Sequence, residues 1–259
     1  MTDAPEPAVA GPAAERVIVF DTTMRDGEQA PGFSMSADDK VRLGHVLAAL
    51  KVDVVEAGFA AASPGDEEAV RRVVGEVEGP IFCSLARSSE ADIDAAWRAL
   101  RSAPARRCHV FLGTSPIHRS AKLRMSTDEV LTATIRAVAY ARSRFDDVEF
   151  SAEDAFRTEP AFLAEVLAAA AEAGAGTLNV PDTVGYATPG EVTTRFTDLI
   201  TALRPRFPDV VFSAHCHDDL GLAVANTLAA IGAGARQFEG AINGIGERAG
   251  NASVEEVVM

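Results

Sequence analysis

The stretch VVFSAHCHDD, residues 210–219, joins a short apolar run to two histidines and two aspartates. The run 210–214 is rich in β-branched and aromatic side chains, a composition typical of a β-strand. On an extended strand, residues two apart point to the same face, so we expect His215 and His217 side by side and Cys216 turned the other way. Two neighbouring imidazoles are either half of a divalent metal site or two polar residues satisfied at a strand end.

Seven other runs of this kind occur along the chain, and each is followed by a polar loop. The eight expected strands are residues 16–20, 52–57, 80–85, 108–112, 147–151, 176–180, 210–214 and 236–242. Stretches of helical length and periodicity lie between them, at residues 36–50, 66–77, 89–101, 127–143, 160–173, 189–203 and 220–233. Apolar strands that alternate with helices indicate a parallel sheet covered by helices, and eight such units close a (β/α)₈ TIM barrel. The alternative, an open doubly wound sheet, would gather its polar residues at one switch point, whereas here they follow many different strands.

The barrel is expected to form one catalytic domain over residues 16–259. Residues 1–15, MTDAPEPAVAGPAAE, are rich in Ala and Pro and are expected to be a disordered tail. At the other end, residues 253–259 offer barely two turns of an eighth helix, where about 10–15 residues are usual. We therefore expect a truncated last helix, and either the chain is a fragment or this edge of the barrel needs a partner.

Charge and cysteine content narrow the class of partner and the compartment. The chain has 259 residues, and its 24 Lys and Arg against 38 Asp and Glu give a net charge of -14. Such acidity argues against nucleic acid or an anionic membrane as the main partner. The three cysteines are too few and too scattered for a disulfide framework, which indicates a reducing compartment. No run of 18 apolar residues and no signal-peptide pattern is present, so we expect a cytoplasmic protein.

Functional groups of a (β/α)₈ barrel project from the carboxyl ends of its strands. Asp26 follows the first expected strand, His215 and His217 end the seventh, and Asn251 lies in the loop after the eighth. Two imidazoles, a carboxylate and an amide oxygen suit Zn²⁺, Mn²⁺ or a similar divalent ion. Asp26 could instead cap a helix or pair with Arg25. Arg25 is either a fixed cation near a developing oxyanion or one half of a surface ion pair.

Several motifs then carry a resemblance to a known family. They are DTTMRDGEQ (21–29) followed by APG (30–32), EAGFAAASPG (56–65), TSPIH (114–118), HCHDDLGLAVAN (215–226) and NGIGERAGN (243–251). In this order they resemble the signatures of the DRE-TIM metallolyase superfamily, and within it those of the 2-isopropylmalate synthase family. The resemblance covers essentially all of residues 16–259.

The resemblance implies a Claisen-type condensation in leucine biosynthesis. A divalent metal, Mn²⁺, Zn²⁺ or Mg²⁺, would hold the oxygens of 2-oxoisovalerate, and the enolate of acetyl-CoA would attack its keto carbon. Thioester hydrolysis would then release coenzyme A and 2-isopropylmalate. The metal ligands that the resemblance implies are Asp26, His215, His217 and Asn251, and the implied catalytic residues are Arg25 and Glu153. Thr183 would bind the 2-oxo acid carboxylate, and the pocket-lining positions are His109, Ser151 and Asn179.

Two departures from the family pattern bear on function. Asp218 stands where the family usually has asparagine, and its extra charge would either tighten cation binding or change hydrogen bonds in the loop. Full-length synthases continue past the barrel with a linker that reaches into the partner's active site and with a domain that binds leucine. We expect neither in this sequence, so the chain would work as a homodimer or be completed by a second chain.

Other functions remain open from the sequence alone. Homocitrate and citramalate synthases share the metal motifs and use other 2-oxo acids. The lyase branch, such as hydroxymethylglutaryl-CoA lyase, usually carries a cysteine in its strand-8 loop, whereas residues 244–251 contain none. A third possibility is a barrel subunit that keeps the metal site and is inactive without a partner chain.

Overall fold

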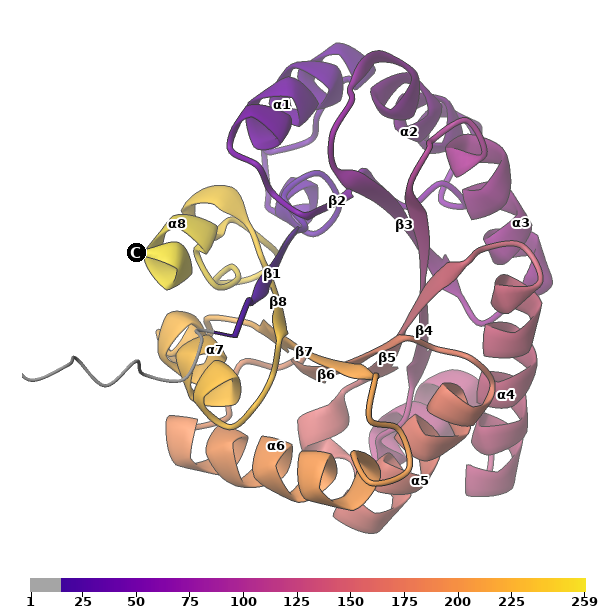
Figure 1. The fold of residues 1–259 in the computed structure, drawn as a ribbon, viewed down its shortest axis with the longest axis vertical. Helices are drawn as coiled ribbons and strands as arrows, with labels where there is room; N and C mark the ends of the chain where they lie inside the picture. The colour runs from indigo at the N-terminus through magenta and orange to yellow at the C-terminus, as the bar shows by residue number, and fades with distance from the viewer. Residues whose placement is uncertain (1–14) are drawn as a thin grey trace, which may run out of the picture.

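The computed structural model describes residues 15–259, which form a closed barrel of parallel strands (Figure 1). Each strand pairs with the next one along the chain, and β8 pairs with β1. The strands are β1 Ile18–Asp21, β2 Val54–Glu56, β3 Ile81–Arg87, β4 Arg106–Gly113, β5 Asp147–Glu153, β6 Thr177–Asp182, β7 Val211–Cys216 and β8 Gln237–Gly240. All eight predicted strands overlap these. The (β/α)₈ barrel is therefore confirmed, and the doubly wound alternative is wrong.

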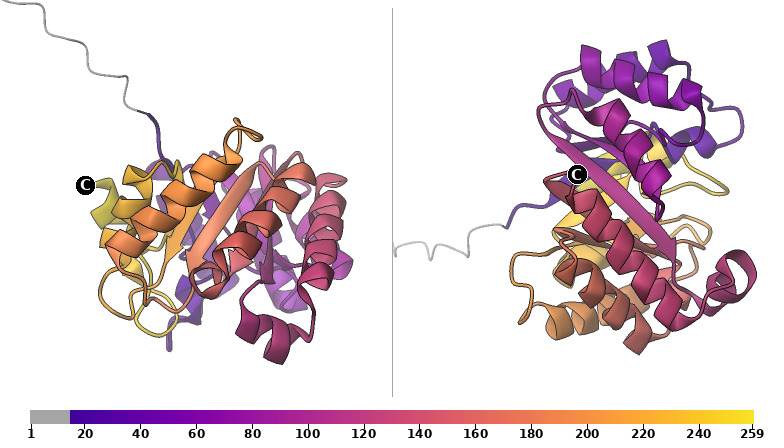
Figure 2. Two further views of the ribbon diagram at one scale, coloured as in Figure 1. Left: turned by 90° about the horizontal axis from the view of Figure 1, so that it is seen from below. Right: turned by 90° about the vertical axis from the view of Figure 1, so that its right-hand side faces the viewer.

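Helices surround the barrel as an outer ring (Figures 1 and 2). They are α1 Ala37–Ala49, α2 Pro64–Glu76, α3 Glu90–Leu100, α4 Thr127–Arg142, α5 Pro160–Glu172, α6 Pro189–Leu203, α7 Ala223–Gly232 and α8 Val254–Val258. The first seven overlap the predicted helices, and α8 is short, as predicted. An unpredicted π-helical turn, His118–Leu123, lies in the loop between β4 and α4. Within residues 15–259 no helix is long and apolar enough to cross a membrane.

Serine side chains define where several of the helices begin. The Ser36 hydroxyl accepts a hydrogen bond from the amide of Asp39, whose carboxylate in turn accepts one from the Ser36 amide. Ser126 and Glu129 form the same reciprocal arrangement at α4. Because each pair satisfies backbone donors that lack a partner within the helix, it fixes the point at which the chain leaves the preceding loop.

Strand alternation separates an apolar outer face of the barrel from a polar inner one. On β5, Val148 and Phe150 belong to the core between barrel and helices, whereas Glu149 and Ser151 point inward and contact other strands. The inner face is apolar mainly on the first three strands, where a cluster of Phe20, Val54 and Cys83 fills it. The interiors of most such barrels are filled by branched apolar residues. The inner face of β4 to β8 instead carries buried charged side chains, among them Arg107, Glu149 and Glu239. The predicted tail, residues 1–15, lies outside the described residues except for Glu15.

Candidate metal centre and active site

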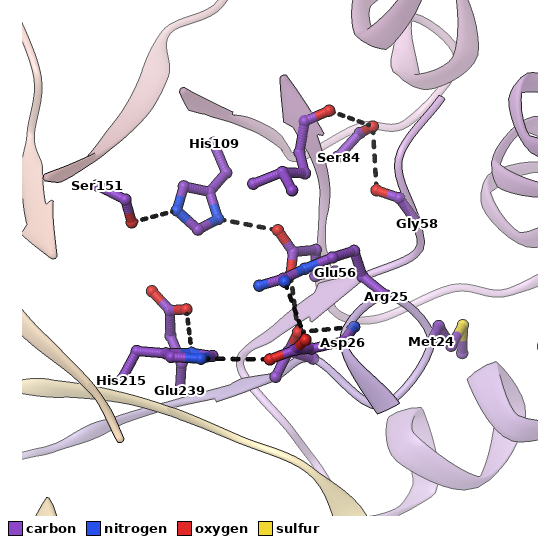
Figure 3. A network of polar contacts seen from close by, with 12 residues as sticks. Met24, Arg25, Asp26, Glu56, Gly58, Ser84, His109, Ser151, His215 and Glu239 are labelled. Carbon is purple, nitrogen blue, oxygen red and sulfur yellow. Dashed lines mark hydrogen bonds and ion pairs between the residues drawn. The ribbon is translucent and has the colours of Figure 1, made fainter. Parts of the chain in front are cut away.

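The four predicted metal ligands converge at the carboxyl end of the barrel. His215 and His217 project from β7 and the residue after it, with their Nε2 atoms 3.0 Å apart. Asp26, in the turn after β1, places Oδ2 3.3 Å from Nε2 of His215 and 3.8 Å from Nε2 of His217. Asn251 pairs with His217 through an isolated β-bridge, which brings the strand-8 loop to the same place. The ligand atoms of Asp26, His215 and His217 thus lie within 4.8 Å of one another, and the β-bridge adds Asn251 beside His217. Figure 3 shows His215 and Asp26 of this cluster.

Two oxygens of this cluster are buried without a hydrogen-bond partner. They are Oδ2 of Asp26 and Oδ1 of Asn251. The Asn251 amide nitrogen donates to the carbonyl of Ile245, so the amide is oriented with its oxygen free. A side chain at position 246 would collide with that amide, since a Cβ on Gly246 would lie 2.5 Å from Nδ2 of Asn251. Buried acceptors are normally paired, so two orphaned oxygens beside two imidazoles fit a divalent cation.

Burial and neighbouring charges set the protonation of the cluster. Burial opposes ionisation of Asp26, but Arg25 and His215 outweigh it and lower the pKa of that carboxyl. Burial lowers the pKa of His217 to about 3, assisted by the charge of His215, so its imidazole is neutral. Burial also acts to lower the pKa of His215, but contacts with Asp26 and Glu239 raise it to about 10. An incoming cation therefore finds two ligands ready and displaces a proton from His215.

The interior carboxylate Glu239 of β8 orients one of the histidines. It is 1% exposed, and its Oε2 lies 2.9 Å from Nδ1 of His215. A carboxylate on the far nitrogen of a metal-binding imidazole fixes both its tautomer and its ring direction. Glu239 was not among the predicted site residues. The signal that could have indicated it is a single acidic residue inside the run 236–242.

Arg25 is held over the same cavity by a second unpredicted carboxylate, Glu56 of β2. Nε of Arg25 donates to Oε2 of Glu56 at 2.6 Å, and Nη1 lies 3.4 Å from Oδ1 of Asp26. Glu56 is fully buried, and although burial opposes ionisation, Arg25 and His109 lower its pKa to about 2. The Arg25 side chain is only 12% exposed, so the surface ion-pair alternative is wrong. Asp26 pairs with Arg25 but makes no side-chain cap to the following 3₁₀ turn, so the helix-cap alternative is also wrong.

Three predicted pocket residues form a hydrogen-bonded chain on the opposite wall. Nδ1 of His109 lies 2.8 Å from Oε1 of Glu56, and its Nε2 lies 2.6 Å from Oγ of Ser151. Asn179 donates from Nδ2 to the same hydroxyl at 2.7 Å. These hydrogen bonds link β4, β5 and β6, and they leave Oδ1 of Asn179 buried and unpaired. These side chains are therefore fixed relative to Arg25 through Glu56 (Figure 3).

Glu153 and Thr183 stand at the rim of the cavity. Both carboxylate oxygens of Glu153 accept from Nζ of Lys122, at 2.8 and 2.9 Å. Lys122 comes from the unpredicted π-helical turn and is the third site residue that the sequence did not indicate. The Thr183 hydroxyl accepts from the amide of Asp154 at 2.9 Å, which keeps it at the end of β6.

One cavity of about 270 Å³ joins these groups. Nine of the ten predicted site residues line this cavity. The tenth, Asn251, pairs with the cavity-lining His217 through a β-bridge. Its apolar lining comes from Phe59, Leu85, Phe111 and Pro181. Cys216 takes no part, because strand alternation turns it toward Ala223 and Ala252 outside the barrel, as expected.

Asp218 acts on the loop and lies outside the ligand cluster. Its Oδ1 accepts a hydrogen bond from the amide of Ala223 at 2.8 Å, at the start of α7. The amide of Asp218 donates to the carbonyl of Gly250. Both of these contacts of Asp218 are hydrogen bonds within the loop.

Comparison with known proteins identifies the family of this barrel. A family model described as HMGL-like matches residues 16–259. The chain belongs to the HMGL-like family. Among its relatives are the 2-isopropylmalate synthases of Aquifex aeolicus, 56% identical over 245 residues, and of Rhodopirellula baltica, 56% identical over 250 residues. Each alignment covers 95% of this chain and 47% of the relative, so the chain spans about half the length of the curated relatives it matches.

Solved structures of lower sequence identity share the barrel fold. A hydroxymethylglutaryl-CoA lyase from Pseudomonas aeruginosa superposes with a TM-score of 0.79 at 21% identity, covering 94% of this chain and 84% of the lyase. The HMG-CoA lyase from Brucella melitensis gives 0.78 at 20% identity, covering 95% and 89%. At this identity the likeness concerns the barrel fold alone.

Proposed function

We propose that residues 16–259 form the catalytic barrel of a 2-isopropylmalate synthase, an acyltransferase that condenses acetyl-CoA with 2-oxoisovalerate in cytoplasmic leucine biosynthesis. Two observations together carry the proposal. The chain is about 55% identical to such synthases, and its candidate metal-binding, catalytic and substrate-binding residues gather around one cavity. The proposal includes a second copy of the chain, or a second chain, as partner. Small molecules are the proposed substrates.

Asp26, His215, His217 and Asn251 would hold the divalent cation, Mn²⁺, Zn²⁺ or Mg²⁺. The orphaned oxygens of Asp26 and Asn251 support this assignment. When bound, such a cation supplies Lewis-acid polarisation of a carbonyl oxygen.

Two charged side chains of the protein, Arg25 and Glu153, would act on the substrates beside the cation. Arg25 places a guanidinium beside the ligand cluster, where it would stabilise negative charge that develops on the keto oxygen. Its Nε is already held by Glu56, so the group is oriented before substrate enters. Glu153, whose side chain is 21% exposed, is the rim carboxylate that would accept a proton from the acetyl methyl group at one of its Oε atoms.

Substrate choice would rest on the two walls of the cavity. Thr183 would bind the carboxylate of the 2-oxo acid, while the row of His109, Ser151 and Asn179 fixes the polar wall. The apolar wall, which includes Leu85 and Phe111, suits a branched alkyl side chain better than a second carboxylate. One methyl group changes binding by only about 1–3 kcal/mol, so homocitrate- and citramalate-type substrates are the competing candidates.

The test is metal-dependent release of free coenzyme A, detected with a thiol reagent. Purified chain is supplied with acetyl-CoA, Mn²⁺ or Mg²⁺, and 2-oxoisovalerate, pyruvate or 2-oxoglutarate. Fastest release with 2-oxoisovalerate is expected, with loss of turnover in Asp26→Ala and normal turnover in the surface control Asp209→Ala. A faster reaction with another oxo acid would overturn the substrate assignment. No release from a folded, metal-loaded chain would favour the subunit that needs a partner.

A further inference from the structure

Lys40 is a lysine buried inside the ring of helices. It lies in the first turn of α1, outside the barrel, and only 1% of its surface is exposed. The two other lysines of the chain, Lys51 and Lys122, are exposed. Lysine is almost never fully buried unless its ammonium is paired, because desolvating the charge is costly. The partners of Lys40 therefore indicate what its burial achieves.

Both partners of Lys40 belong to the loop that carries Arg25 and Asp26. Its Nζ donates to the main-chain carbonyl of Met24 at 2.9 Å and to Oε1 of Glu28 at 2.7 Å. The two contacts lie on either side of Arg25 and Asp26 in the sequence. A third neighbour, Gly58, follows β2, and a Cβ there would lie 3.2 Å from Nζ. The ammonium thus lies in a space that a glycine leaves open.

The same loop is fastened from the barrel side by a single carbonyl. The amides of Arg25, Asp26 and Gly27 all donate to the carbonyl of Thr22, at 3.0, 2.8 and 3.2 Å. Met24 is fully buried among apolar side chains of the outer core, while Arg25 and Asp26 point into the site (Figure 3). Lys40 holds the outer side of the turn whose inner side Thr22 holds. Without it, nothing polar among the described contacts fixes the Met24 carbonyl.

We propose that Lys40 is a positioning residue, whose ammonium sets the direction in which the turn 24–28 presents Arg25 and Asp26 to the cation and the 2-oxo acid. Its catalytic consequence rests on the proposed function, whereas the ordering of the turn does not. Lys40 touches neither substrate nor the ligand cluster and acts only through the turn. A side chain that served packing alone would need no ammonium.

The test compares Lys40→Met, which keeps the aliphatic stem and removes the charge, with Leu199→Ala, a cavity variant in α6 far from the turn. Amide hydrogen exchange is measured on residues 22–28, together with Mn²⁺ affinity and kcat. In Lys40→Met we expect amides 25–27 to exchange about tenfold faster and Mn²⁺ affinity to fall about tenfold, the scale of one lost charge-assisted hydrogen bond. Leu199→Ala should lose stability and leave exchange at 25–27 and Mn²⁺ affinity unchanged.

The proposal is overturned if amides 25–27 of folded Lys40→Met exchange within about twofold of the wild-type rate, since a factor below two is under 0.5 kcal/mol. It is also overturned if Leu199→Ala raises exchange at these amides by the same factor as Lys40→Met. If Lys40→Met does not fold, Glu28→Gln takes its place, because it removes only the charged partner, and unchanged exchange there also overturns it. A wild-type chain that releases coenzyme A faster with another oxo acid than with 2-oxoisovalerate, combined with faster exchange in Lys40→Met, would overturn the proposed substrate and leave the positioning role standing.

Discussion

Replacing Arg107 by methionine is expected to destabilise the barrel from within. Arg107 of β4 is 5% exposed, and its Nε donates to Oδ2 of Asp147 at 2.9 Å. Its Nη1 donates to Oε2 of Glu149 at 2.9 Å and to Oε1 of Gln237 at 2.7 Å. Gln237 in turn donates to Glu149 and to the Ser213 hydroxyl, so the network links β4, β5, β7 and β8. Methionine keeps the length of the stem and leaves Glu149 without its cation.

The expected cost follows from the fate of Glu149. Removing one partner of a buried ion pair costs about 3–5 kcal/mol, because the other charge stays buried. Burial and Glu239 already raise the pKa of Glu149 to about 7 against the opposing effect of Arg107. The folded pKa lies above the ordinary value of 4.5, so the proton on Glu149 stabilises the fold at low pH, and this contribution is lost as the pH rises. In Arg107→Met the pKa rises further, and the variant should be more unstable at pH 8 than at pH 6.

Urea denaturation followed by circular dichroism at pH 6 and pH 8 measures both effects. The double variant Arg107→Met with Glu149→Gln removes both charges, and we expect it to recover most of the lost free energy of unfolding at pH 8. A cost of less than about 1 kcal/mol that is the same at both pH values, as for an exposed pair, would refute the reasoning. So would a double variant whose cost is simply the sum of the single costs.

Four further predictions follow from the site and its surroundings. Burial raises the pKa of Asp21 to about 7 against the lowering effect of Thr23, so its proton stabilises the fold at low pH and is lost as the pH rises. Between pH 5 and pH 8 the free energy of unfolding of Asp21→Asn should therefore fall by about 2–3 kcal/mol less than that of the wild type, as thermal or urea unfolding can measure. Asp26→Ala should abolish Mn²⁺ binding without unfolding the barrel, and unchanged metal content by elemental analysis would contradict the ligand assignment. Asp218→Ala should cost about 1 kcal/mol of stability through its lost hydrogen bond to the amide of Ala223 and leave Mn²⁺ affinity unchanged, as calorimetry can check. Arg25→Lys should keep the fold and lose most coenzyme A release, since an ammonium cannot reproduce the planar fork; wild-type rates would remove Arg25 from the mechanism.

The sequence by itself was enough to predict the barrel and most of the residues that gather in its candidate site. Eight apolar runs separated by helical stretches define the fold, because parallel strands must be covered by helices and eight of them close. The period of two on a strand placed His215 and His217 on one face and excluded Cys216. Carboxyl ends of parallel strands meet at one edge, so Asp26 and Asn251, more than 200 residues apart, could be assigned to the same cluster.

Only the tertiary structure decided which buried groups hold the site in place. Glu56 joins Arg25 to His109, and Glu239 orients His215, across contacts that join different strands. Such pairs depend on the register and closure of the barrel, and no local spacing in the chain encodes them. Lys40 is the clearest case, since an amphipathic helix normally turns lysine to solvent, and only the packing of α1 against the β1 and β2 loops buries its ammonium. The polar residues at the strand ends follow from local sequence, whereas the supports behind them follow from how distant elements pack.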